Sequence, residues 1–356
     1  SGSALDEGGG AGGGIQINHP HYHAGTSYVA PLPYVAETRS DGTASFTLAY
    51  TSYPHLQRTI WKVTLRPDEA GFRSDYLFEN LSPFAMGFNP WINAMFPLRK
   101  DVQFILPADW VSGHWFGIGE KEEFGNWLRP WPIDEQGVDQ SHILNLKEPS
   151  VFGYGITDGY SGVYFHDDDD GLVRVFDPKV MPAAKAAGKW QPEPRGWDWC
   201  EVWGALSHNM EDPLWIGPNE TLGASDYWFP VRGIGGMTWA NERAALNLTR
   251  KGGKLTCAIY YPRDLGRCVV RLTVDGRHLL RESVRLDPRR PFRRQVVCPI
   301  EVDEVRFTVL DLSGNVVLNH QKFFSKRPRR VYEMVETPWR RKNAFTKVLW
   351  EEAFTP

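Results

Sequence analysis

The chain has little cysteine, no long apolar run and almost no segment with helical periodicity. Its 356 residues include four cysteines, none of them in a Cys-Xaa-Xaa-Cys pair, so neither a disulfide scaffold nor a zinc ribbon is indicated. No window of about 18 apolar residues occurs, which excludes a transmembrane helix. Before residue 240, only a doubtful turn near Met181 to Ala187 suggests a helix.

The amino-terminal residues 1–11 form a glycine-rich leader that we expect to be flexible. They contain no basic segment followed by an apolar stretch, so an intact secretion signal is not expected. The chain is therefore expected to be cytoplasmic, or secreted with its signal already removed.

Charge and tryptophan divide the chain at the same place. Residues 1–240 hold 16 Lys and Arg against 30 Asp and Glu, whereas residues 241–356 hold 24 against 13. Thirteen of the 15 tryptophans lie at or before Trp239. These differences predict two physical units. The basic residues of the second unit are spread along strand-like segments, so we expect no nucleic-acid partner.

Eight segments of the first unit are rich in aromatic and β-branched residues and are separated by Gly, Pro, Asn and Asp, a pattern typical of strands. They are residues 44–50, 57–66, 73–80, 102–107, 162–166, 172–177, 198–206 and 221–231. Residues 167–171 are predicted to form the turn of a hairpin.

A second series of short alternating segments follows the glycine-rich linker at 232–236: residues 244–249, 254–261, 268–274, 277–285, 293–299, 305–311 and 316–324. Seven short strands in about 80 residues is typical of an immunoglobulin-like sandwich. Thr337-Pro338 then offers a helix start, and the spacing of Phe345, Val348 and Leu349 predicts a helix over Trp339 to Glu352. We assign the sandwich to residues 233–325 and a basic segment with this short helix to 326–356.

The strongest chemical signal is tryptophan interleaved with polar residues, as in residues 127–131 and 197–203. Aromatic faces beside carboxylates and amides suit a sugar ring, whose C–H groups stack on aromatics while its hydroxyls need hydrogen-bond partners. A large aromatic core is the alternative. In a strand, alternation places Glu201 on the same face as Trp199 and Trp203. A carboxylate there would be partly desolvated, which suits proton transfer.

Six segments follow one another in a recognisable order: GGGIQINHPHYHAG, ENLSPFAMGFNPWINAMFP, WPIDEQGVDQSH, SGVYFHDDDDGLVRVFDP, CEVWGAL and GPNETLGASDYWFPV. Together they resemble the galactose mutarotase superfamily, whose members have a β-supersandwich. They resemble more closely an uncharacterised bacterial branch known only as a domain of unknown function and frequently followed by TPR repeats. The resemblance implies an all-β chain with a mutarotase-like β-supersandwich over residues 12–232.

In that superfamily a glutamate acts as base on the anomeric hydroxyl, a histidine acts as acid, and an aspartate and a second histidine hold the sugar. The resemblance implies Glu201 as the base, Asp139 as the aspartate, and His19 or His23 as the sugar-holding histidine. Asn89 stands where the acid histidine is expected. Because asparagine cannot donate and recover a proton at neutral pH, the resemblance disfavours simple mutarotation.

Several reactions remain open for these residues. We expect Glu201 to be the principal acid or base, with Asp139, His142, His166 or His114 as its partner. Two carboxylates would permit glycoside hydrolysis, whereas elimination beside a uronate needs a base and a cation, for which Arg195 or Arg129 are candidates. The residues expected to hold substrate are His19, His23, Asn89, Trp91, Asn93, His114, Trp131, Arg195, Trp199 and Trp203.

Glycosidic bond cleavage by a carbohydrate-active enzyme is the preferred expectation. The alternatives are a non-catalytic glycan-binding protein, an aldose epimerase and an assembly module whose aromatics only form a core. The expected partner is an oligosaccharide or polysaccharide, with no membrane. Members of the branch carry further strands before the Gly-Gly-Ile segment, so open strand edges predict self-association.

Two segments resemble metal sites. His19, His21 and His23 alternate and would share one face of a strand, as a three-histidine site requires. Residues 166–171 resemble a calcium loop, but their ligand positions depart from that pattern, so a hairpin turn is expected. We expect neither a metal nor another cofactor.

Overall fold

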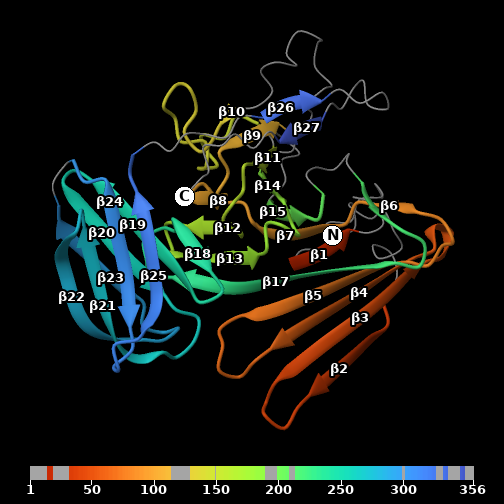
Figure 1. Cartoon of the computed structure of the whole chain (residues 1–356), viewed down its shortest axis with the longest axis horizontal. Coiled ribbons are helices and arrows are strands. Elements are labelled where there is room, and N and C mark those ends of the chain that lie inside the picture. The colour runs from red at the N-terminus through yellow and green to blue at the C-terminus, as the bar shows by residue number, and fades with distance from the viewer. Residues whose placement is uncertain are drawn as a thin grey trace.

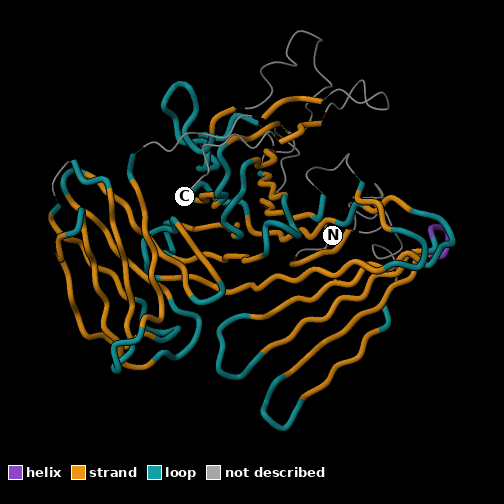
Figure 2. The backbone as a smooth tube through the Cα atoms, in the orientation of Figure 1, coloured by secondary structure: helices purple, strands orange, loops and turns teal. Residues whose placement is uncertain are grey.

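The computed structural model of the chain describes residues 14–18, 32–113, 129–148, 150–188, 199–207, 213–298, 301–325, 332–335 and 345–348. Figure 1 shows a large β unit beside a smaller one. Strands dominate the described backbone (Figure 2), and its one helical element is the short 3-10 turn η2 (Tyr53–His55). None of the described helical structure could span a membrane. The predicted all-β class is confirmed.

Two antiparallel sheets form the large unit. The seven-stranded sheet has the order β1 (Gly14–Asn18), β7 (Trp91–Pro97), β15 (Trp199–Ala205), β14 (Ala183–Ala187), β11 (Ser150–Tyr154), β9 (Trp110–Gly113) and β10 (Arg129–Pro130). The eight-stranded sheet has the order β2 (Tyr34–Thr38), β3 (Ala44–Ser52), β4 (Gln57–Leu65), β5 (Phe72–Asn80), β17 (Thr221–Arg232), β13 (Asp170–Phe176), β12 (Tyr160–Phe165) and β8 (Val102–Ile105). β6 (Met86–Phe88) and β16 (Leu214–Ile216) form a separate short pair. This two-layered architecture is the supersandwich that the sequence predicts.

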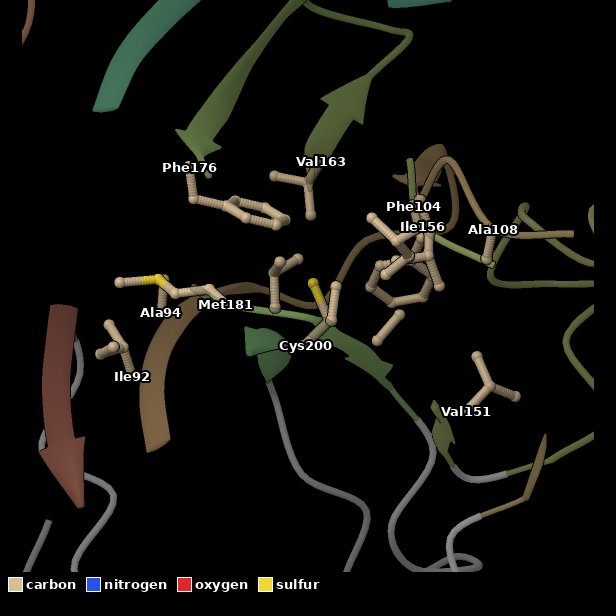
Figure 3. Close-up of a cluster of buried hydrophobic side chains, with 14 of the residues drawn as sticks. Ile92, Ala94, Phe104, Ala108, Val151, Ile156, Val163, Phe176, Met181 and Cys200 are labelled. Carbon is tan, nitrogen blue, oxygen red and sulfur yellow. The ribbon is translucent and has the colours of Figure 1, made fainter. Parts of the chain in front are cut away.

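One hydrophobic core fills the space between these two sheets. Cys200 of β15 faces Val163 and Phe176 of the other sheet across it (Figure 3). Successive side chains of a strand point to opposite faces. Glu201 and Trp203 therefore lie on the outer face of the seven-stranded sheet, away from this core.

The smaller unit consists of two four-stranded sheets. One has the order β18 (Trp239–Asn241), β19 (Ala244–Lys251), β20 (Lys254–Tyr260) and β23 (Phe292–Val297). The other has the order β22 (Arg277–Leu286), β21 (Gly266–Val274), β24 (Glu304–Leu310) and β25 (Val316–Phe323). They enclose a separate apolar core that includes Leu246, Val270 and Phe307. This is the second β-sandwich that the alternating segments predict.

The glycine-rich segment between the units is anchored to both of them. Ile234 is fully buried, and the backbone N–H of Gly235 donates to the Asp169 carboxylate at 2.7 Å. Residues of both units, among them Phe229 and Tyr260, share a third apolar cluster. The segment therefore fixes the two units against each other.

The prediction of a helix over Trp339 to Glu352 is wrong at residues 345–348, the part of this segment that the structure describes. β27 (Phe345–Val348) is a strand and pairs antiparallel with β26 (Tyr332–Val335). Its aromatic and β-branched residues favour a strand, and the partner strand satisfies its backbone hydrogen-bonding groups. The doubtful turn near Met181 to Ala187 is also strand, because β14 pairs with β11 and β15 on either side.

Candidate functional site

A buried carboxylate, that of Glu201, lies on the outer face of the seven-stranded sheet. The side chain is 3% exposed. Its Oε1 accepts a hydrogen bond from Trp199 Nε1 at 3.0 Å, and its Oε2 accepts one from Trp203 Nε1 at 2.5 Å. The alternation of β15 thus places one acceptor between two donors. Because hydrogen bonds to a charged acceptor are strong, the carboxylate is held in one position.

A buried lysine, Lys185, lies on the neighbouring strand β14. The ladders pair it with Trp203 of β15 and Phe152 of β11. Its Nζ is 4.5 Å from the ring centroid of Trp203 and 5.2 Å from that of Phe152. Burial lowers the pKa of Lys185 to about 7, although the charge of Glu201 opposes this shift. A lysine with such a pKa can take up or release a proton near neutral pH.

Sequence reasoning missed Lys185. The segment Ala183-Ala184-Lys185-Ala186-Ala187 lacks the β-branched and aromatic residues that mark strands, so its strand was not predicted. The available signal was one lysine flanked on both sides by two alanines. This signal is not specific, because alanine and lysine are also common in exposed helices.

Several buried polar atoms on the same face have no hydrogen-bond partner among the described residues: Asn18 Oδ1 and Nδ2, Asn93 Oδ1, Ser112 Oγ and Ser150 Oγ. The ladders place them on the Glu201 face, because Asn93 is paired with Trp203 and Ser112 with Phe152. Leaving a buried polar group unpaired costs about 1–3 kcal/mol, and native proteins contain few such groups. This face therefore has unused capacity for hydrogen bonds to a polar ligand or to water.

Asn89 stands where the resemblance expects an acid histidine. Its side chain holds Trp91, one of the aromatic residues of this face. Its Oδ1 accepts hydrogen bonds from Trp91 Nε1 at 2.7 Å and from Ser207 Oγ at 2.8 Å. Trp91 is fully buried and packs edge-on against Trp203, with ring centroids 5.8 Å apart. Asn89 thus orients Trp91 against Trp203.

The predicted catalytic partners Asp139, His142 and His166 gather in another place, beside the edge strand β8. The rings of His142 and His166 are 5.5 Å apart, and His142 Nε2 is 3.9 Å from Asp139 Oδ2. Gln103 Oε1 lies 2.8 Å from His166 Nε2. Phe104, the next residue of β8, faces the core, so Gln103 and this group lie on the outer face of the eight-stranded sheet. The core separates them from the buried glutamate.

The remaining predicted site residues are placed as follows. Trp131 is 3% exposed and its indole N–H donates to the Leu106 carbonyl oxygen at 2.9 Å, so it belongs to the main core. His19, His23, His114 and Arg195 lie outside the described residues, as does His21. Residues 166–169 form the turn between β12 and β13. In the described part of the chain, no three His, Cys, Asp or Glu side chains are grouped to hold a metal ion.

Two family models match the chain. One, described as "Domain of unknown function (DUF5107)", matches residues 7–202, and the other, described as "YphG-like protein, second domain", matches residues 239–320. The resemblance inferred from the sequence is confirmed at the level of the family.

The chain is also similar to several solved structures. A TPR-domain containing protein from Parabacteroides distasonis is 17% identical with a TM-score of 0.50, and the match covers 61% of this chain and 37% of that one. A galactose mutarotase related enzyme from Lactobacillus acidophilus is 11% identical, with a TM-score of 0.43 and coverage of 61% and 82%. A galactose mutarotase-like protein from Clostridium acetobutylicum is 10% identical, with a TM-score of 0.43 and coverage of 60% and 69%. The first of these shares the fold, and the chain spans 37% of its length.

Proposed function

The chain belongs to the DUF5107 family of domains of unknown function, and we propose that it is a carbohydrate-active enzyme that cleaves a glycosidic bond on the outer face of its seven-stranded sheet. The observation that carries this proposal is the Glu201 carboxylate, buried between two indole N–H donors and beside Lys185. Indole rings stack on the C–H faces of sugars, and unpaired amide and hydroxyl groups suit sugar hydroxyls. Asn93 and Ser150 supply such groups on this face.

The chemistry of this face favours elimination over hydrolysis. Hydrolysis by the common route uses two carboxylates, and among the described strand residues of this face Glu201 alone carries one. In elimination, a base takes the proton beside the carboxylate of a uronate while the glycosidic C–O bond breaks. The bonding electrons of that bond leave with the oxygen, and a carbon–carbon double bond forms. Glu201 would accept this proton, and protonated Lys185 would offset the charge of the uronate carboxylate and donate a proton to the leaving oxygen.

A substrate screen tests this proposal. The wild type is incubated with neutral and uronate-containing polysaccharides, and both new reducing ends and the ultraviolet absorbance of a new double bond are measured. Elimination predicts the two signals together, whereas hydrolysis predicts reducing ends alone. Absence of product from every polysaccharide would overturn the enzymatic proposal.

Three variants locate the activity. Lys185→Met and Glu201→Gln should each lower kcat about 100-fold or more, the usual contribution of a proton-transfer group. Trp215→Ala removes an exposed aromatic of β16 and should leave kcat unchanged. Glu201→Gln places an amide against one indole N–H, so the urea midpoint of each variant is measured to separate loss of folding from loss of catalysis.

A non-catalytic glycan-binding protein is the second candidate. It is favoured by the occupation of both Glu201 oxygens by indole donors and by the 3% exposure of that side chain. Glu201 would then orient Trp199, the partly exposed indole of this pair, as a stacking surface. In affinity electrophoresis, polysaccharide should retard the wild type without any product, and Trp199→Ala should abolish the retardation. Epimerisation is disfavoured because Asn89 is engaged with Trp91 and Ser207.

A further inference from the structure

A charged cavity of about 340 Å³ lies on the outer face of the eight-stranded sheet, where the large unit meets the smaller one. Strands β3, β4, β5 and β17 provide its floor, and Glu242 and Arg263 line it from the smaller unit. The two units are joined beside it, because Ala70 N–H donates to the Pro262 carbonyl oxygen at 2.7 Å. This face is opposite the one that carries Glu201, so the cavity is independent of the function proposed above.

The cavity has an excess of positive charge. Three carboxylates line it against five basic side chains, which are Arg39, Lys62, Arg66, Arg73 and Arg263. The Glu69 carboxylate is held by Arg263 at 2.8 Å and by Arg66 at 3.4 Å, and Arg73 is 3.0 Å from Asp75. Within the described structure, the Lys62 amine has no carboxylate within 4.0 Å. Lys62 therefore remains available to an anion in the cavity.

Two buried polar atoms also indicate a ligand. Tyr227 lines the cavity and is 5% exposed, and its hydroxyl lies beside the Glu69 carboxylate and Arg263 without a hydrogen bond of 3.5 Å or less to any described residue. Burial, and then the charge of Glu69, raise the pKa of Tyr227, so the hydroxyl keeps its proton and can donate it to an acceptor. Arg263 Nε is likewise buried without a partner in the described chain. Gly71 leaves room for this hydroxyl, because a Cβ added there would lie 2.6 Å from the hydroxyl oxygen.

We propose that this cavity binds a small ligand that carries a phosphate or sulfate group. A tetrahedral oxyanion accepts hydrogen bonds from several directions, which suits the donors of Tyr227, Arg263 and Lys62. The excess of two positive charges complements a dianion. Ser45 and Thr64, which also line the cavity, offer neutral partners for the rest of the ligand. Because the donors come from both units, a bound ligand ties the units together.

Isothermal titration calorimetry of the full chain tests this proposal. The probes are inorganic phosphate, inorganic sulfate and glycerol 3-phosphate, with glycerol as the neutral comparison. We expect saturable binding of the anions that weakens as salt is added, because salt screens charged groups, and no binding of glycerol. Tighter binding of glycerol 3-phosphate than of phosphate assigns the cavity to an organic ester, and equal binding assigns it to the free oxyanion.

Matched variants locate the binding. Lys62→Gln and Tyr227→Phe should each weaken binding about tenfold. Lys254→Gln, which neutralises an exposed lysine of β20, should not change it. Lys62 lies on the sheet surface, so its variant is expected to fold, and its urea midpoint checks this. Lack of saturable binding of all three anions up to about 10 mM, or equal affinity of the wild type and Lys62→Gln, overturns the proposal.

Discussion

Arg174 and Asp226 form a completely buried ion pair in the core of the large unit, with Arg174 Nε 2.6 Å from Asp226 Oδ2. The Asp226 carboxylate also accepts a hydrogen bond from Trp228 Nε1 at 2.8 Å. Arg174 extends across the core to Gly204 of β15, where an added Cβ would lie 1.4 Å from its Nη1. The ion pair of one sheet thus packs against the strand of the other sheet that carries Glu201.

Asp226→Asn should destabilise the protein by about 3–5 kcal/mol, because it leaves the Arg174 charge buried without its partner. Urea unfolding followed by tryptophan fluorescence measures this loss. Asp264→Asn is the matched control, since it removes one of the two carboxylates that pair with the exposed Arg285 and should cost less than about 1 kcal/mol. Equal losses in the two variants would contradict the importance of the buried pair.

Gly204→Ala should destabilise the protein by about 1–3 kcal/mol or more, because the new methyl group overlaps the Arg174 guanidinium. Gly223→Ala is a matched control in β17, where the nearest atom to an added Cβ is the Tyr76 carbonyl oxygen at 3.9 Å. Its effect should stay within about 0.5 kcal/mol. The same urea assay compares the two, and tolerance of Gly204→Ala would show that Arg174 can move aside at little cost.

The pKa of Lys185 predicts how its replacement depends on pH. Burial lowers that pKa to about 7 from the ordinary value of 10.5. Below about pH 7 the lysine is charged in both the folded and the unfolded protein, so the folded protein bears the full cost of burying the charge. Between the two values the unfolded chain binds more protons, so stability rises with pH. Lys185→Met removes this cost. The free energy of unfolding of the variant minus that of the wild type should therefore be larger near about pH 6 than near about pH 10.

Urea midpoints of the wild type and Lys185→Met at several pH values check this expectation. Burial also lowers the pKa of Lys322, to about 8. Because Lys322 is present in both proteins, its effect on the pH dependence of stability cancels in the comparison. Glu201, which faces Lys185, keeps its two indole donors in the variant. A difference in stability that does not change with pH would mean that Lys185 titrates normally.

The neighbouring His142 should influence the titration of His166. Burial, and then the charge of His142, lower the pKa of His166 below the ordinary 6.5, while Asp101, Asp167 and Asp169 oppose the shift. His142→Gln should therefore raise the pKa of His166, which NMR titration of the imidazole protons measures. Because the unfolded chain binds this proton more tightly, His166 should make stability fall as the pH drops below 6.5. An unchanged His166 pKa in the variant would exclude the coupling.

Local patterns predicted much of the fold but less of the candidate site. The alternation in β15 correctly indicated that Trp199, Glu201 and Trp203 share a face, because strand periodicity is a property of the backbone itself. The strand that carries Lys185 was not predicted, because its alanines have low strand propensity and its two neighbouring strands hold it in place. The prediction of a carboxy-terminal helix was wrong at Phe345–Val348 because pairing with β26 outweighed the helical spacing of the apolar residues.

The sequence by itself determined the all-β class, the division into two units and the faces of individual strands, because strand periodicity, turn residues and composition are local properties. Only the tertiary structure decided which of these faces meet. It placed Glu201 beside Lys185 through the register of β14 and β15, and it placed His166 on the opposite side of the sandwich core. A β-sandwich has two outer faces, and local alternation cannot distinguish them. Strand order and layer packing make that choice, and both depend on contacts between residues far apart in the chain.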